Sequence, residues 1–155
     1  MITDDWEFNV IGVYNYRKPG AFRHYFDFIV ENHNRIEGDI CEAGVFKGSS
    51  LLATGLLLKE LGSSKQVYGF DNFRGFSGLY HEYDDILMFD NLLRDGKITD
   101  EHHKKIQRSL KIRSWQLDGQ ASVANVSSSG DFSGGRAEDI MEKARWLELD
   151  NIHLI

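Results

Sequence analysis

The chain has 155 residues, of which 41% are hydrophobic and 12% aromatic, so it can fill the core of one domain. Its formal net charge of −6 argues against nonspecific nucleic-acid binding, which needs a basic face, and no nucleic-acid partner is expected. No apolar stretch is long enough to span a membrane, and the acidic start Met1–Asp5 does not resemble a secretory signal, so we expect a cytoplasmic protein without a membrane partner.

The first third of the chain predicts an N-terminal arm followed by a helix. Residues 1–20 mix aromatic and polar residues and end in the turn signal Pro19-Gly20, which separates the arm from the rest of the chain. Residues 21–32 predict an amphipathic helix, because their large apolar residues recur at helical spacing. These apolar residues are Phe22, Tyr25, Phe26 and Ile29.

Two strands and a connecting helix are expected next. The first strand covers residues 39–43, and a helix then runs to Leu61, with Ser49 or Ser50 as its N-cap and Gly62 just past its C-terminus. The second strand covers residues 66–70. The single cysteine, Cys41, lies in the first strand, and we expect it to be a small buried hydrophobe rather than a nucleophile.

The middle of the chain predicts a loop and two helices. Residues 72–83 are rich in glycine and aromatic residues, which favours a loop over a ligand. Helices are expected at residues 84–93 and 100–112, separated by the turn around Gly96. Residues 119–135 predict either a flexible loop or a lid on the substrate side.

The end of the chain predicts a helix at residues 137–147 and the start of a third strand at residues 151–155. Because crossovers between parallel strands are right-handed, the second strand should lie between the first and the third. The first strand then forms an edge of the sheet, where unpaired backbone groups would favour self-association into a homo-oligomer.

The ends of the first two strands carry the features of a βαβ nucleotide site. Glu42, Gly44 and Gly48 follow the first strand, and Asp71 ends the second strand, where its carboxylate can hold a ribose. The spacing Glu-x-Gly-x-x-x-Gly differs from the dinucleotide fingerprint Gly-x-Gly-x-x-Gly. The pattern therefore indicates an adenosine-bearing ligand other than a dinucleotide.

The same segments resemble a known enzyme family. Glu42–Gly48 is similar to motif I of class I S-adenosylmethionine-dependent methyltransferases, and Asp71–Phe76 is similar to the Asp-Ser-Phe-x-Gly-Leu segment of the macrocin O-methyltransferase family, which methylates sugar hydroxyls. The likeness covers about residues 36–155 and departs at Asn72, where serine is usual, and at Phe76, where leucine is usual. It implies an α/β, Rossmann-like class I methyltransferase fold, a parallel sheet with flanking helices, whose C-terminal strands are missing from this chain.

The resemblance implies that residues 21–155 are the cofactor-binding part of a single methyltransferase domain, truncated after the third strand. If the resemblance holds, Asp71 accepts hydrogen bonds from both ribose hydroxyls. The alternative role of Asp71 is to cap a helix or a turn. Glu42 faces the methionine end or the ribose, or else is a surface acid, and Phe73 packs on the adenine or closes the core. The expected S-adenosyl-L-methionine contacts are Glu42, Gly44, Val45, Phe46, Lys47, Gly48, Ser49, Asp71, Asn72, Phe73 and Arg74, of which Lys47 and Arg74 could instead be only solvated.

No catalytic residue or metal ligand is assigned. The family often uses a divalent metal such as Mg²⁺, held by acids after the fourth and fifth strands, and those positions lie beyond Ile155. The six histidines have no metal-ligand spacing. His81 in the proposed ligand loop could act as a base, although a hydrated histidine is the more common case.

The expected function is that of a methyltransferase that acts on a hydroxyl of a sugar or glycosylated small molecule. The chain by itself is expected to be inactive, because the catalytic half of the family is missing. Two alternatives remain open at this stage. One is a nicotinamide-dependent oxidoreductase built on the same βαβ unit, and the other is a non-catalytic methyltransferase-like binding protein.

Overall fold

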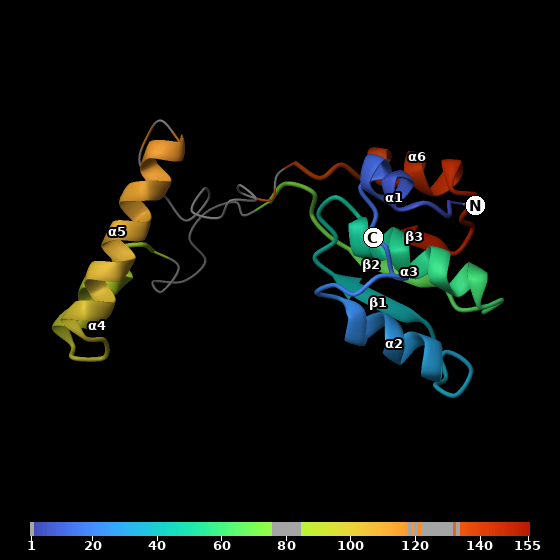
Figure 1. Cartoon of the computed structure of the whole chain (residues 1–155), viewed down its shortest axis with the longest axis horizontal. Coiled ribbons are helices and arrows are strands. Elements are labelled where there is room, and N and C mark those ends of the chain that lie inside the picture. The colour runs from blue at the N-terminus through green and yellow to red at the C-terminus, as the bar shows by residue number, and fades with distance from the viewer. Residues whose placement is uncertain (1, 76–84, 118, 120, 122–131, 133) are drawn as a thin grey trace. The chain divides into compact units, whose positions relative to one another are not determined.

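The computed structural model describes residues 2–75, 85–117, 119, 121, 132 and 134–155. The chain forms two compact units (Figure 1): unit 1 combines Met1–Phe73 with Gly134–Ile155, and unit 2 is Arg74–Ser133. Unit 1 is an α/β structure in which helices flank a parallel sheet. The described part of unit 2 is helical.

The sheet of unit 1 has three parallel strands in the order β1-β2-β3, as predicted. The strands are β1 (Ile40–Ala43), β2 (Val67–Phe70) and β3 (Ile152–Leu154), each slightly shorter than expected from the sequence. In the register, Val67 of β2 pairs with Ile40 of β1 on one side and with Ile152 of β3 on the other. The central position of β2 follows from two crossovers in the same direction.

Helix α3 (Ser49–Glu60) forms the centre of the core. Its residues from Leu51 to Leu58 are all buried, and the helix packs on β2 and β3 (Figure 1). A helix that is apolar on every side must be covered on every side. The N-terminal helices and α6 (Ala137–Trp146) contribute to the same core through buried residues such as Phe8, Phe26 and Ile140.

The two ends of α3 differ in how well the sequence predicted them. The N-cap is Gly48 rather than Ser49 or Ser50, and no side chain caps the helix. The prediction was wrong because the Ser50 hydroxyl donates to Glu42 instead. At the C-terminus, Gly62 has the expected left-handed φ of +63°, and Ser63 donates its amide to the Leu58 carbonyl, which completes the predicted helix stop.

The N-terminal residues belong to the core of unit 1 and include a helix, α1 (Asp5–Ile11), that the sequence did not predict. Phe8 is fully buried, and Ile2, Val13 and Tyr16 are buried beside it. The helix has seven residues, and Phe8 is the one that is buried, so local periodicity was too short to reveal it. Its place is fixed by long-range contacts.

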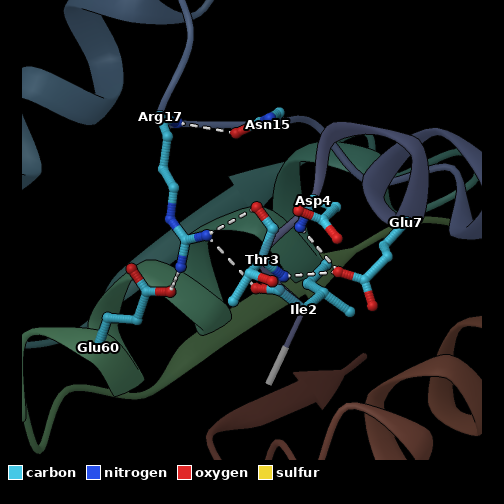
Figure 2. Close-up of polar contacts among 7 residues, drawn as sticks. All are labelled: Ile2, Thr3, Asp4, Glu7, Asn15, Arg17 and Glu60. Carbon is cyan, nitrogen blue, oxygen red and sulfur yellow. Dashed lines mark hydrogen bonds and ion pairs between the residues drawn. The ribbon is translucent and has the colours of Figure 1, made fainter.

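Arg17 ties this N-terminal segment to α3 (Figure 2). Its guanidinium donates to the carbonyl of Thr3 at 3.2 Å and pairs with the carboxylate of Glu60 near the end of α3. A fork of donors can serve both acceptors at once. Glu7 accepts hydrogen bonds from the amides of Thr3 and Asp4, which secures the start of α1 (Figure 2).

Helix α2 (Arg23–Asn32) lies on the β1 side of the sheet (Figure 1), and its start is two residues later than predicted. Phe26 and Ile29 are its buried residues, in agreement with the predicted apolar face. The Tyr25 hydroxyl lies 3.0 Å from the hydroxyl of Thr54 in α3, so a polar contact accompanies the apolar packing of these two helices.

Among the described residues of unit 1, one face of the sheet carries exposed side chains. Gly69 faces Leu51 of α3, and side chains alternate along a strand, so Phe70 and its register partner Ala43 face the other way. Both are exposed, as is Cys41 on the same face of β1. The expectation of a buried Cys41 was therefore wrong, because it assumed that both faces of the parallel sheet are covered.

Unit 2 contains α4 (Met88–Arg94) and α5 (Asp100–Leu117) in its described part. Helix α4 begins four residues later than predicted, and α5 extends five residues further than expected. Neither helix has a buried residue. Asp90 of α4 and His103 of α5 form a polar contact of 2.6 Å between the two helices. Most of the two predicted loops, at residues 72–83 and 119–135, lies outside the described residues.

Candidate cofactor-binding site

The turn between β1 and α3 depends on two glycines in the left-handed region. Gly44 has a φ of +84° and Gly48 a φ of +77°, conformations that side chains other than glycine adopt at a cost. A Cβ on Gly48 would also lie 3.0 Å from Ile140 of α6, whereas a Cβ on Gly44 would meet no atom within 4 Å. Gly48 thus permits close packing, and Gly44 leaves space at the carboxyl end of β1.

Asp71 connects this turn to the end of β2. One carboxylate oxygen accepts hydrogen bonds from the amides of Val45 at 2.7 Å and Phe46 at 2.8 Å. The other oxygen accepts from the amide of Phe73 at 2.7 Å. Phe46 and Phe73 both have a φ of +53°, so Asp71 holds two residues in a conformation that they rarely adopt.

The amides also set the ionisation of Asp71. Its partial burial acts to raise the pKa, but hydrogen bonds from the amides of Phe46, Phe73, Val45 and Asn72 outweigh burial, so the pKa of the carboxyl is lowered. A carboxylate has about four acceptor positions, and the amides use most of them. Asp71 would have to release at least one amide to bind both hydroxyls of a ribose.

Glu42 is half-buried at the start of a second polar network. Burial raises the pKa of its carboxyl, while the hydroxyl of Ser50, which donates to it at 2.9 Å, acts in the opposite direction. The Thr54 hydroxyl donates to the Ser50 carbonyl at 2.9 Å and contacts the hydroxyl of Tyr25. Burial raises the pKa of Tyr25, and the negative charge of Glu42 acts in the same direction, whereas the hydrogen bond with Thr54 acts to lower it. The network runs from β1 through α3 to α2.

The other predicted residues have distinct surroundings. Val45 is buried, and the Lys47 ammonium lies 5.1 Å from the centre of the Phe46 ring, close enough for a cation–π contact. Phe73 packs against the core, in agreement with one of its two predicted roles. Arg74 is the first residue of unit 2.

The returning chain packs tightly on the turn. A Cβ on Gly135 would lie 2.0 Å from the Phe46 carbonyl oxygen, and one on Gly134 would lie 3.6 Å from the Lys47 side chain. Gly135 therefore permits a backbone contact that no other residue could make. From its sequence, Gly135 was expected in a loop, and no local signal connects it with the site.

Sequence reasoning also missed Ser50 as the hydrogen-bond partner of Glu42, and it missed Thr54 and Tyr25 as the next members of the network. The signal for Ser50 was its place two residues after Gly48, in the first turn of the helix that follows the glycine turn. Tyr25 was recognised only as part of an apolar face. Nothing in its local sequence indicates a contact with residues of α3.

The described residues contain no group of three or more His, Cys, Asp or Glu that could hold a metal ion. His81 lies outside the described residues. Within the described ranges, no helix is both long and apolar enough to cross a membrane. No protein-family model matches the chain, and a search of curated proteins also found no match.

Proposed function

We propose that unit 1 binds S-adenosyl-L-methionine at the carboxyl ends of β1 and β2, and that the protein belongs to the class I methyltransferases that modify a hydroxyl of a sugar or glycosylated small molecule. The observation that carries the proposal is the contact of Asp71, at the end of β2, with the amides of Val45 and Phe46 in the turn after β1. Ligands of open α/β sheets bind at this edge.

The residues at this edge suit the cofactor chemically. S-adenosylmethionine carries hydroxyl donors on its ribose and a protonated amino group at its methionine end, and Asp71 and Glu42 offer carboxylate acceptors for such donors. The space beside Gly44 leaves room for a ligand to approach the backbone. When bound, the cofactor supplies the sulfonium methyl group that is transferred to the acceptor hydroxyl.

The chain's own residues would contribute by binding and orientation. Asp71 would hold the ribose, and Glu42, which Ser50 keeps in one position, would hold the methionine end. Fixing the cofactor in this way removes translational and rotational freedom before the transfer step. We leave the catalytic base unassigned.

Calorimetric titration of the purified chain with S-adenosylhomocysteine and, separately, with NAD⁺ tests the proposal. We expect saturable binding of S-adenosylhomocysteine and no heat from NAD⁺, because the turn lacks the third glycine of the dinucleotide fingerprint. Binding of NAD⁺ alone would indicate the oxidoreductase alternative. If neither ligand binds, the proposed cofactor site is wrong.

A further inference from the structure

A hollow in unit 1, about 230 Å³ in volume, lies between the start of α1 and the start of α2. Tyr14 and Phe22 form one wall, with ring centres 4.8 Å apart and ring planes inclined by 32°. Tyr14 is 45% exposed and Phe22 is 39% exposed, so both rings present apolar surface to a ligand. We refer to this hollow as the Tyr14–Phe22 pocket.

Three polar residues that line the pocket are paired with one another. One oxygen of the Asp5 carboxylate accepts a hydrogen bond from the Asn15 amide at 2.9 Å, and the other lies 2.7 Å from the Lys18 ammonium. Lys18, followed by Asn15, lowers the pKa of Asp5, which therefore stays ionised near neutral pH. The pocket thus offers a carboxylate, an amide and an ammonium group together with two aromatic rings.

The pocket is attached to the candidate cofactor site through α3. The amide of Tyr14 donates to the carbonyl of Ser49 at 3.1 Å, and Ser49 directly follows Gly48 of the glycine turn. Phe22 contacts the ring of Tyr25 with centres 6.5 Å apart, and Tyr25 belongs to the network that leads to Glu42. The aromatic wall is thus held by residues that also shape the cofactor site.

The mixture of groups selects one kind of ligand. The C–H face of a sugar ring packs on the negative face of an aromatic ring, and its hydroxyls can both donate to Asp5 and accept from Asn15 and Lys18. A purely apolar ligand would make no hydrogen bond with these groups, which pair with one another when the pocket is empty. A polyhydroxylated ring suits both the aromatic rings and the polar groups.

We propose that the Tyr14–Phe22 pocket binds the sugar whose hydroxyl accepts the methyl group. This inference rests on the proposed methyltransferase function, because only that function requires a sugar site beside the cofactor. The sugar would stack on Tyr14 and Phe22 and would bind Asp5 and Asn15 through its hydroxyls. The pocket would therefore determine which sugars the protein accepts.

Amide chemical shifts of the full-length chain, labelled with ¹⁵N, can test the proposal in the presence of saturating S-adenosylhomocysteine. The probes are methyl glycosides of the common hexoses and 6-deoxyhexoses, added one at a time. We expect at least one of them to cause saturable shifts at Tyr14, Asn15, Lys18 and Phe22. If no glycoside shifts these amides, the proposal is overturned.

Variants identify the contribution of the aromatic wall. We expect Phe22→Ala to weaken glycoside binding by about tenfold, the effect of losing one aromatic contact. The matched control is Phe28→Ala, which removes an exposed aromatic side chain of α2 that does not line the pocket and should leave glycoside binding unchanged. Equal glycoside affinity in Phe22→Ala and the native chain would contradict the assignment.

Two further measurements separate the possible failures. Asp5→Asn, which keeps the size of the side chain, should also weaken glycoside binding, and it tests the pocket if Phe22→Ala does not fold. S-adenosylhomocysteine affinity should remain within about twofold in all three variants, since none of these residues contacts the glycine turn by side chain. Glycoside shifts without S-adenosylhomocysteine binding would support the sugar pocket and reject the proposed cofactor site.

Discussion

Asp71 has a structural role that can be separated from its proposed role in binding. Its carboxylate accepts amides from both sides of the site, Val45 and Phe46 after β1 and Phe73 after β2. Such an acceptor stabilises the turn whether or not a ligand is present. A loss of cofactor affinity on removal of Asp71 would therefore not by itself prove a ribose contact.

A comparison of two ligands resolves this ambiguity. We expect Asp71→Ala to weaken S-adenosylhomocysteine binding by about 1.5 to 3 kcal/mol, the effect of losing hydrogen bonds to a charged group. The 2′,3′-dideoxy analogue of S-adenosylhomocysteine lacks the ribose hydroxyls, so the same variant should lose less affinity for it. The loss that remains with this analogue measures the effect of the altered turn. Calorimetry on both proteins with both ligands gives the coupling free energy between Asp71 and the ribose hydroxyls.

Asp39→Ala is the matched control for Asp71→Ala. Asp39 accepts the amide of Gln66 at 2.9 Å, and thus also joins the first two strands, but at their amino ends. Its replacement should reduce stability without changing the affinity for S-adenosylhomocysteine. If the coupling free energy for Asp71 is zero, Asp71 is an anchor of the turn and the ribose contact is rejected.

At the level of secondary structure, the packing of α3 against α6 depends on Gly48. This residue ends the glycine turn, caps α3 and approaches Ile140 so closely that a Cβ would lie 3.0 Å from it. Gly62 at the other end of α3 also has a left-handed φ, but a Cβ there would meet nothing within 4 Å. Substitutions at these two glycines can therefore distinguish the cost of backbone strain, present at both, from the cost of crowding against Ile140, present only at Gly48.

We expect Gly62→Ala to lower the free energy of unfolding by about 1 to 2 kcal/mol, from backbone strain alone. Gly48→Ala should lose about 1 to 3 kcal/mol more, since the added methyl group also crowds Ile140. Urea unfolding followed by circular dichroism measures both changes. Equal losses for the two variants would mean that α6 moves away from α3 without cost.

The elements that the sequence predicted are those whose signals are local. Local sequence signals, such as turn glycines and apolar residues at helical spacing, placed β1, β2, α3 and α6 within a few residues, and Gly62 was recognised as the helix stop. Helix α1 was missed, because it is short and its buried residue Phe8 packs in a core that distant parts of the chain form. The N-cap of α3 was also wrong, because the partner of Ser50 is a carboxylate on another element.

The same distinction applies to the candidate site. The glycine turn and Asp71 were found from their spacing, since a βαβ unit brings the ends of neighbouring parallel strands together. The partners Tyr25 and Thr54 and the contact of Gly135 with Phe46 were not found. They join segments whose proximity only the complete fold determines.

At the level of the whole molecule, unit 2 is inserted into unit 1. The core residues described for unit 1 come from its own two segments, and the residues of unit 1 that precede and follow the insertion are Phe73 and Gly134. The amides of Phe73 and Phe46 donate hydrogen bonds to the same Asp71 carboxylate, and Gly134 lies next to Phe46. The two residues that flank the insertion, Phe73 and Gly134, thus both lie close to Phe46.

We expect unit 1 to fold without unit 2. In the variant, about ten glycine and serine residues replace Arg74–Ser133, and such a linker spans about 17 Å on average. The variant should keep a cooperative urea transition with a midpoint close to that of the full chain, because its core is intact. A native-length linker of the same composition serves as the control, and loss of cooperative unfolding in both variants would show that unit 2 is needed.

The insertion also affects the order in which the sheet can assemble. The paired residues Ile40 and Val67 are separated by roughly 27 positions, whereas Val67 and Ile152 are separated by roughly 85, so closing the second pair costs about 1 kcal/mol more in chain entropy. Strands β1 and β2, with α3 between them, therefore form the more local folding nucleus, and β3 joins later. The glycine turn and Asp71 both belong to that nucleus, so the candidate cofactor site would form early in folding, before the sheet is complete.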